Sequence, residues 1–367
     1  MKKRVLLIAH EFPPKIGGAG MVAKDICNNL AKNDIQVDII TEYIKGREKS
    51  AYNLIEIKTV RKLIPVFYYW KLCKINLDQY DKIILNDAAG IMCICMFFNK
   101  EIQKKCIVYM HGQEVEGIFI NPSLLYKITH YKKGFITLLD NCFRVVSVGS
   151  HLKNKFISKT NLRHLEDKIE VIKNGIDTNI FHYDYIDLHK KFNIPKDTHI
   201  LLSVSRIVEK KGYDNMYKIF KRLILENERF HWMIAGDGEY LSNFKQMIEN
   251  DGLSQYITFL GRIKRESLRT YYSSVDMFWL LSNYEEALPL SYLEAQFCNT
   301  VAMGRNDSGT MEVIKNDKTG FLVNNDEEAY TIIKNREYEK LRQADKINYI
   351  NEFSMEKNSE KLLNLIL

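Results

Sequence analysis

The chain has 367 residues, of which 46% are hydrophobic and 27% are charged, and its formal net charge is +7. This composition is typical of a globular protein and excludes disordered, collagen-like and coiled-coil chains. Because a single core stops growing at roughly 250–300 residues, we expect two domains. The seven cysteines include no Cys-x-x-Cys pair and indicate reduced thiols in a cytoplasmic protein. The apolar stretches are too short for a signal peptide or a membrane span.

Short apolar segments alternate with amphipathic ones in two series, a pattern typical of βαβ units and parallel sheets. The first series predicts strands at Val5–Ala9, Val37–Thr41, Lys82–Leu85, Cys106–Met110, Val145–Val148 and Ile169–Lys173, with helices such as Met21–Asn33 and Leu124–Asp140. The second predicts strands at Ile200–Ser205, Trp232–Ala235, Ile257–Leu260, Met277–Leu281, Thr300–Met303 and Phe321–Val323. The polar segment Phe181–Thr198 is expected to be a linker, and Ile347–Leu367 a helix.

A glycine-rich loop follows the first predicted strand and leads directly into a helix. Its glycines, Gly17, Gly18 and Gly20, let a ligand approach the backbone, and free N–H groups at a helix start favour an anion. Gly18-x-Gly20-x-x-Ala23, with Glu42 as a ribose acceptor, also fits a dinucleotide fingerprint, although an intervening Pro-Pro loop weakens that match. A glycine turn that merely reverses the chain is the alternative.

Charged residues follow two strands of the second series. Arg206 and Lys211 come after one strand, where a planar fork and a point charge can converge on a diphosphate. Glu286 precedes a helix whose first turn includes Pro289, and Glu294 lies two turns further along. Carboxylates there can accept hydrogen bonds from sugar hydroxyls. The alternatives are a solvated basic loop and two exposed helix glutamates.

A histidine, His111, stands at the end of a strand of the first series. In a cleft, its ring could form a hydrogen bond with a substrate hydroxyl or with a phosphate oxygen. The alternative is a lone histidine without a functional role.

In combination, these segments resemble the retaining glycosyltransferases of family 4, whose GT-B fold has two Rossmann-like domains. The resemblance runs from Val5 to about Val323. In chain order its motifs are Pro13-Pro14 with Gly17-Gly18-Ala19-Gly20, His111-Gly112, Asn174-Gly175-Ile176-Asp177 with Phe181, Ser205-Arg206 with Lys211-Gly212, Ala235-Gly236-Asp237-Gly238, Phe259-Leu260-Gly261, Glu286 with Glu294, and Glu312-Val313-Ile314 with Thr319-Gly320.

The resemblance implies an acceptor-binding domain over residues 1–180 and a donor-binding domain over residues 198–349, with a last helix at about 350–367 that packs back on the first. It implies transfer of a sugar from a nucleoside diphosphate sugar with retention of configuration, in cell-surface polysaccharide or glycolipid synthesis such as that of lipopolysaccharide or capsule. The residues to which it gives catalytic roles are Arg206, Lys211, Glu286 and His111. Those to which it gives donor-binding roles are Gly17, Gly18, Arg206, Lys211, Gly238, Glu286, Leu288, Pro289, Leu290 and Glu294.

The resemblance requires neither a protein nucleophile nor a cofactor. No Asp-x-Asp triplet, the usual metal bridge of the other major glycosyltransferase fold, occurs in the chain, so we expect no metal. One departure is Ala287, which stands where many members of the family have glycine. If its φ is negative, alanine is tolerated there.

Two other functions fit part of the sequence. One is a nicotinamide-dependent oxidoreductase, which would leave the cation and carboxylate pairs unexplained; the other is a non-catalytic sugar-nucleotide-binding module. Nucleic acid is disfavoured because no known nucleic-acid-binding motif accompanies the basic residues.

The positive charge lies in the first half of the chain. Residues 1–178 have 28 Lys and Arg against 18 Asp and Glu, a net charge of +10, and the remainder has a net charge of −3. The segments Arg61–Lys71 and Tyr126–Lys133 mix cations with aromatic residues, as interfacial helices do. We therefore expect a peripheral protein on the inner face of the cell membrane with a lipid-linked acceptor; a solvated basic face is the alternative.

Overall fold

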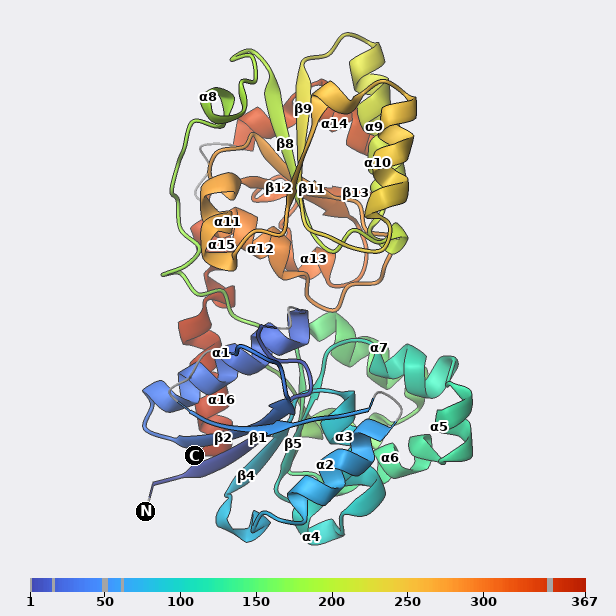
Figure 1. The fold of residues 1–367 in the computed structure, drawn as a ribbon, viewed down its shortest axis with the longest axis vertical. Helices are drawn as coiled ribbons and strands as arrows, with labels where there is room; N and C mark the ends of the chain where they lie inside the picture. Colours follow the sequence, from blue (N-terminus) through green and yellow to red (C-terminus); the bar gives the residue numbers. More distant parts are fainter. Residues whose placement is uncertain (1, 15–16, 48–51, 61–62, 342–345) are drawn as a thin grey trace. The chain divides into compact units, whose positions relative to one another are not determined.

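The computed structural model describes residues 2–14, 17–47, 52–60, 63–341 and 346–367. The chain divides into two compact units (Figure 1). The first comprises residues up to Asn174 together with Asn358–Leu367, and the second comprises Gly175–Lys357. The first boundary thus lies at residue 174, six residues before the expected end of the first domain at residue 180.

The first unit contains a seven-stranded parallel sheet with the order β3-β2-β1-β4-β5-β6-β7. Its strands are β1 (Arg4–Ile8), β2 (Gln36–Glu42), β3 (Asn53–Ile57), β4 (Lys82–Leu85), β5 (Cys106–Met110), β6 (Arg144–Ser147) and β7 (Ile169–Val171). Six of them match the predicted strands to within one or two residues at each end. β3 was not predicted, because it lies at the edge of the sheet, where four of its five residues are not buried.

The helices of the first unit are α1 (Gly18–Lys32), α2 (Ile64–Leu72), α3 (Ala88–Phe97), α4 (Lys100–Gln103), α5 (Leu124–Ile128), α6 (Tyr131–Asn141) and α7 (Ser150–Thr160), with a π-helical segment at Val115–Ile120. The last helix, α16 (Met355–Ile366), belongs to the first unit from Asn358 onward. The single helix expected over 124–140 is two helices, because His130 has a φ of 50° and interrupts the helical path. α16 lies beside α1, where Asn29 Nδ2 donates to the main-chain oxygen of Ser359 at 3.5 Å.

The second unit contains a six-stranded parallel sheet with the order β10-β9-β8-β11-β12-β13. Its strands are β8 (His199–Val204), β9 (Phe230–Ala235), β10 (Ile257–Gly261), β11 (Met277–Leu280), β12 (Val301–Arg305) and β13 (Gly320–Val323), and all six were predicted. Its helices are α8 (Leu188–Phe192), α9 (Tyr213–Leu225), α10 (Leu241–Asn250), α11 (Arg265–Tyr272), α12 (Leu290–Phe297), α13 (Thr310–Val313), α14 (Asp326–Lys334) and α15 (Ile347–Ile350). Two buried indoles, Trp232 and Trp279, meet in its core with ring centroids 5.0 Å apart.

The segment expected to be a linker is instead packed into the second unit. The ring of Phe181 is buried near that of Tyr272, with their centroids 6.3 Å apart. The main-chain N–H of Asp184 donates to Ser273 Oγ at 2.9 Å. These contacts satisfy a polar backbone that a solvated linker would leave to water. The expected long C-terminal helix is likewise interrupted, because α15 ends at Ile350 and α16 begins at Met355.

In both sheets the order of strands reverses once. The reversal falls between β1 and β4 in the first unit and between β8 and β11 in the second. In open parallel sheets, ligands bind at the carboxyl ends of the strands where the order reverses. The loops that follow these four strands are therefore the places to look for a site.

Candidate active site

The predicted site residues of the second unit surround the reversal between β8 and β11. Arg206 and Lys211 follow β8, Gly238 follows β9, and Glu286 follows β11. Gly17, Gly18 and His111 belong to the first unit and follow β1 and β5. The contacts within each unit show how each of these residues is held.

Lys211 and Glu286 form an ion pair between Nζ and Oε1. Their side chains are only 18% and 12% exposed, so the pair is poorly screened by water. Ser308 lies in the loop after β12 and fixes the backbone at Glu286. Its Oγ accepts a hydrogen bond from the main-chain N–H of Glu286 at 3.1 Å. A cation and a carboxylate predicted to contact the donor are thus already in contact with each other.

Gly212 holds the loop that carries Lys211 close to the loop after β11. Its φ is +76°, and a Cβ atom there would lie 1.8 Å from the main-chain oxygen of Leu281. A second tie comes from Asn283, whose N–H donates to the main-chain oxygen of Lys210 at 2.9 Å. Only glycine allows both the backbone conformation and the close approach. The position of Lys211 therefore depends on Gly212.

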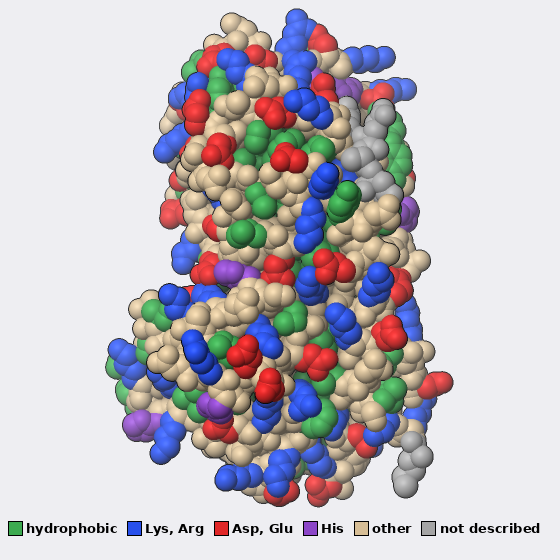
Figure 2. All heavy atoms as spheres, turned by 180° about the vertical axis from the view of Figure 1, so that it is seen from behind, with side chains coloured by type: hydrophobic (Ala, Val, Ile, Leu, Met, Phe, Trp, Pro, Cys, Tyr) green, Lys and Arg blue, Asp and Glu red, His purple; other side chains and the backbone are tan. Residues whose placement is uncertain are grey.

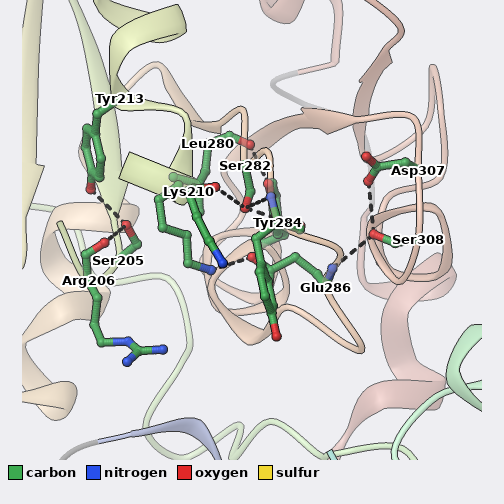
Figure 3. Close-up of polar contacts among 12 residues, drawn as sticks. Ser205, Arg206, Lys210, Tyr213, Leu280, Ser282, Tyr284, Glu286, Asp307 and Ser308 are labelled. Carbon is green, nitrogen blue, oxygen red and sulfur yellow. Dashed lines mark hydrogen bonds and ion pairs between the residues drawn. The ribbon is translucent and has the colours of Figure 1, made fainter. Parts of the chain in front are cut away.

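Arg206 differs from Lys211 because its side chain is exposed. Ser205 Oγ donates to the main-chain oxygen of Arg206 at 3.0 Å and lies 2.8 Å from the Tyr213 hydroxyl, so the backbone is anchored. Figure 3 shows the guanidinium extending away from these contacts. Within the described ranges it forms neither a hydrogen bond nor an ion pair, so all its N–H donors remain available to a ligand.

Gly238 has a structural reason to be glycine. A Cβ atom there would lie 2.2 Å from the main-chain oxygen of Ile207. That same oxygen accepts a hydrogen bond from the N–H of Tyr240 at 3.1 Å, and Ile207 N–H donates to Asp237 O at 3.1 Å. The loop after β9 therefore supports the loop that carries Arg206. Gly238 acts by allowing this packing.

The remaining predicted donor residues lead into α12. Leu288 and Pro289 are buried, and Leu290 is the first residue of the helix. No side chain caps this helix start, so the N–H groups of its first turn can bind an anion. Ala287 has a negative φ, so alanine is compatible with the backbone there. The strict glycine is Gly309, whose Cβ would lie 2.2 Å from Ala287 O.

Glu294 is held on the buried side of α12. Its side chain is 11% exposed. Arg265 Nε lies 3.4 Å from one carboxylate oxygen, and the Tyr272 hydroxyl donates to the other at 3.2 Å. The spacing from Glu286 predicted that Glu294 lies within the helix. Its partners Arg265 and Tyr272 were not predicted, because they precede Glu294 by 29 and 22 residues in the chain.

The glycine loop of the first unit packs around Glu11. Gly17 precedes α1, and a Cβ atom on it would overlap the Glu11 carboxylate. Gly18 has no such neighbour within 4 Å, so open space adjoins the first residue of α1. The dinucleotide alternative does not fit this geometry, because β1 ends at Ile8 and α1 begins only at Gly18. Residues 15 and 16 of this loop lie outside the described residues.

Asp87, after β4, was missed by sequence reasoning although it organises this edge of the sheet. Its side chain caps α3 by accepting from Ala89 N–H at 3.0 Å, and it also accepts from the N–H groups of His10 and Glu11. Burial raises the pKa of the carboxyl group, which these main-chain donors oppose. An aspartate between a strand and a helix was the available signal.

His111 lies at the end of β5, as predicted. Its Nε2 is 3.3 Å from Asn86 Oδ1, and its main-chain N–H donates to Glu114 Oε1 at 3.0 Å. Burial lowers the pKa of the imidazole to about 4, so the ring is neutral at pH 7. A neutral histidine at this position can exchange hydrogen bonds with a ligand without adding charge.

Neither a metal-binding cluster nor a membrane-spanning helix occurs in the described parts of the chain. No group of three or more His, Cys, Asp or Glu side chains there could hold a metal ion. No helix among the same residues is long and apolar enough to cross a membrane.

Two protein-family models match this chain. A family model described as Glycosyltransferase Family 4 matches residues 16–180, and one described as Glycosyl transferases group 1 matches residues 184–362. The chain belongs to the family 4 glycosyltransferases. The two matches cover both units and both groups of site residues.

Relatives of this family 4 chain are similar over most of their length. An uncharacterized glycosyltransferase of Methanocaldococcus jannaschii is 26% identical, covering 87% of this chain and 85% of the relative. N-acetyl-alpha-D-glucosaminyl L-malate synthase of Bacillus anthracis is 24% identical, covering 84% and 81%. A GDP-mannose-dependent monoacylated alpha-(1-6)-phosphatidylinositol monomannoside mannosyltransferase of Corynebacterium glutamicum is 23% identical, covering 88% and 84%.

Solved structures show the same fold. Sucrose-phosphate synthase of Thermosynechococcus elongatus superposes with a TM-score of 0.81 at 16% identity, covering 99% of this chain and 98% of the other. Anabaena HepE in complex with UDP and glucose gives 0.76 at 15% identity, covering 99% and 98%. WaaG, a glycosyltransferase involved in lipopolysaccharide biosynthesis, gives 0.75 at 15%, covering 99% of both. The family 4 chain has the GT-B fold, with a parallel α/β sheet in each unit.

Proposed function

We propose that this glycosyltransferase moves a hexose from a nucleoside diphosphate sugar to an acceptor with retention of configuration. The observation that carries the proposal is the Lys211–Glu286 ion pair beside the start of α12. Arg206 adds an exposed guanidinium from the neighbouring strand end. Two cations and uncapped helix N–H groups at adjacent strand ends suit a diphosphate.

In this proposal the chain's own groups stabilise the leaving nucleoside diphosphate. Lys211 and Arg206 attract its oxygens, and preorganised charges of this kind often contribute the largest part of a rate enhancement. Glu286 gives up part of its contact with Lys211 and accepts hydrogen bonds from the donor sugar. Glu294 accepts hydrogen bonds from the ribose hydroxyls. The departing phosphate takes the acceptor proton on the same face, so no protein nucleophile is needed.

The same cations would do the work that a metal does in other transferases. We therefore expect transfer to continue at an undiminished rate in excess EDTA. Loss of transfer on chelation, restored by Mg²⁺ or Mn²⁺, would contradict this part of the proposal.

The acceptor is proposed to be lipid-linked, as the name of the Corynebacterium relative indicates for that protein. On α2 and the residue before it, Leu63, Val66 and Trp70 are 51%, 37% and 66% exposed, and their spacing places them on one helical face. On α5, Leu124 and Ile128 are 73% and 67% exposed. These apolar groups adjoin lysines in both sequences, as in helices that bind anionic bilayers.

The basic excess alone does not support the membrane proposal. On the face shown in Figure 2, Lys and Arg side chains are interspersed with acidic ones rather than gathered in one patch. Arg61 and Lys62, part of the first predicted patch, lie outside the described residues. The decisive test replaces Lys127, Lys132 and Lys133 by Glu: sedimentation with vesicles containing anionic lipid should be lost, and unchanged sedimentation would refute the role of this segment.

A thermal-shift screen of UDP-, GDP- and ADP-sugars identifies the donor, because a ligand that binds only the folded state raises Tm. Transfer is then followed by NMR, which should show the same anomeric configuration in donor and product; inversion would refute retention. Glu286→Gln should reduce transfer more than nucleotide binding. Nucleotide binding without transfer to any acceptor would favour a non-catalytic binding module.

A further inference from the structure

Asn86 lies at the end of β4, beside His111, and is fully buried. Its Nδ2 donates to the main-chain oxygen of Ala19, in α1, at 2.9 Å. This bond fixes the orientation of the amide, because only the NH₂ group can donate to a carbonyl oxygen. Asn86 Oδ1 must therefore be the atom that faces His111 Nε2 at 3.3 Å.

The orientation of the amide determines which ring nitrogen of His111 carries the proton. An amide oxygen only accepts hydrogen bonds, so Nε2 must be protonated. Because burial lowers the pKa of His111 to about 4, the ring holds a single proton at pH 7. Nδ1 is then an acceptor with a free lone pair, and in the described part of the chain no group donates to it.

We infer that Asn86 is a positioning residue that holds His111 as the Nε2–H tautomer, so that Nδ1 accepts a hydrogen bond from a hydroxyl group of the bound sugar. A fully ionised phosphate oxygen cannot take that place, because it is itself only an acceptor. His111 therefore recognises a hydroxyl rather than the diphosphate. The assignment of the hydroxyl to a sugar rests on the proposed function, whereas the tautomer does not.

Besides the Asn86 amide, the Asn86 main chain forms a hydrogen bond with the imidazole, which opposes part of the effect of burial on the His111 pKa. Among the described residues, Glu114 and Tyr109 also adjoin His111. Glu114 accepts from the main-chain N–H groups of His111 and Gly112 at 3.0 and 2.7 Å. The ring of Tyr109 stacks at a centroid distance of 6.2 Å, and burial raises the pKa of its hydroxyl, so it stays neutral near pH 7. Both groups are unchanged in an Asn86 variant, which isolates the effect of residue 86.

The first test is NMR of the full chain with ¹⁵N-labelled histidine. At pH 7 the His111 spectrum should show a protonated Nε2 and an unprotonated Nδ1, and no titration between pH 8 and 5.5. Addition of pyrophosphate should leave Nδ1 unprotonated. The Nδ1–H tautomer, or an imidazolium at pH 7, would overturn the inference.

The second test is Asn86→Asp. An adjacent carboxylate raises the pKa of a histidine by about 1–3 units, so His111 of the variant gains a proton at Nδ1 at a higher pH than it does in the wild type. Transfer by the variant should then fall by about two- to 90-fold between pH 8 and pH 5, whereas transfer by the wild type falls by only about 1.1-fold. Asn99→Asp, which retains the helix cap of α4, is the charge-matched control. A variant profile parallel to that of the wild type would overturn the positioning role.

If no transfer is found with any donor, the proposed function fails, but the NMR spectrum still decides the tautomer. If transfer is found and the spectrum shows a proton on Nδ1, the inference about Asn86 fails alone.

Discussion

Replacing Lys211 by Met removes a cation from the proposed diphosphate site while keeping the length of the side chain. The Lys211 side chain is 18% exposed, so its interaction with a phosphate would be only partly screened. A hydrogen bond to a charged group contributes about 1.5–3 kcal/mol, which corresponds to UDP binding about 10–150 times weaker in the variant. The change also removes the ion-pair partner of Glu286, so that its unpaired carboxylate repels the bound diphosphate.

Isothermal titration with UDP at constant ionic strength measures the effect. Lys210→Met is the matched control, because Lys210 is exposed and binds its neighbours through its main-chain oxygen. The double variant Lys211→Met/Glu286→Gln should bind UDP more tightly than Lys211→Met alone, since it removes the uncompensated charge. UDP affinity within twofold of the wild type in Lys211→Met, or an equal loss in Lys210→Met, would refute the assignment.

Three further predictions concern stability, each measured by urea denaturation. Gly212→Ala should lower the free energy of unfolding by at least about 2 kcal/mol, because a methyl group at φ +76° would overlap a main-chain oxygen 1.8 Å away. Gly252 has a φ of +69° but open space around it, so Gly252→Ala should lower the free energy of unfolding by only about 1 kcal/mol. Equal losses of stability in the two variants would contradict the predicted overlap. Asp87→Ala should cost about 1–2 kcal/mol through loss of the α3 cap; an unchanged urea midpoint would show that the cap is dispensable. Burial lowers the pKa of His231 to about 4, so the unfolded chain binds more protons below pH 6.5, and this histidine alone should lower stability by about 2 kcal/mol from pH 7 to 5. Burial of His111 adds a fall of similar size, so His231→Gln should remove about half of the pH dependence, and an unchanged slope would argue against this assignment.

Elements buried on both faces were the most predictable part of the fold. Continuous apolar segments such as Val5–Ala9 became central strands, because a central parallel strand is covered by helices on both sides. Asn53–Ile57 has polar residues among its apolar ones and pairs along one side only, so it lacked that signal. The turn at His130 depends on a single positive φ, which an apolar pattern does not report.

For the site, sequence indicated which strand ends carry charge but not which side chains meet. Arg206, Lys211 and Glu286 follow strands, so strand prediction was enough to place them at one edge of a sheet. The pairing of Arg265 with Glu294, and of Asn86 with His111, depends on the order in which strands lie side by side. Neither pair has a short motif, because its members come from different elements. The functional roles themselves stay predictions until the variants are measured.

The first unit is completed late during synthesis, because its last segment, Asn358–Leu367, is made after the second unit. Leu362, Leu365 and Ile366 are buried in α16, which from Asn358 onward belongs to the first unit although the second unit is made before it. At translation rates of about 5–20 residues per second, the 193 residues after Asn174 take about 10–40 s to make. During that time the nascent first unit lacks the helix that covers part of its apolar surface. A chain cut at residue 174 would have the same defect permanently, so separate production of this unit should require Asn358–Leu367 to be joined to it.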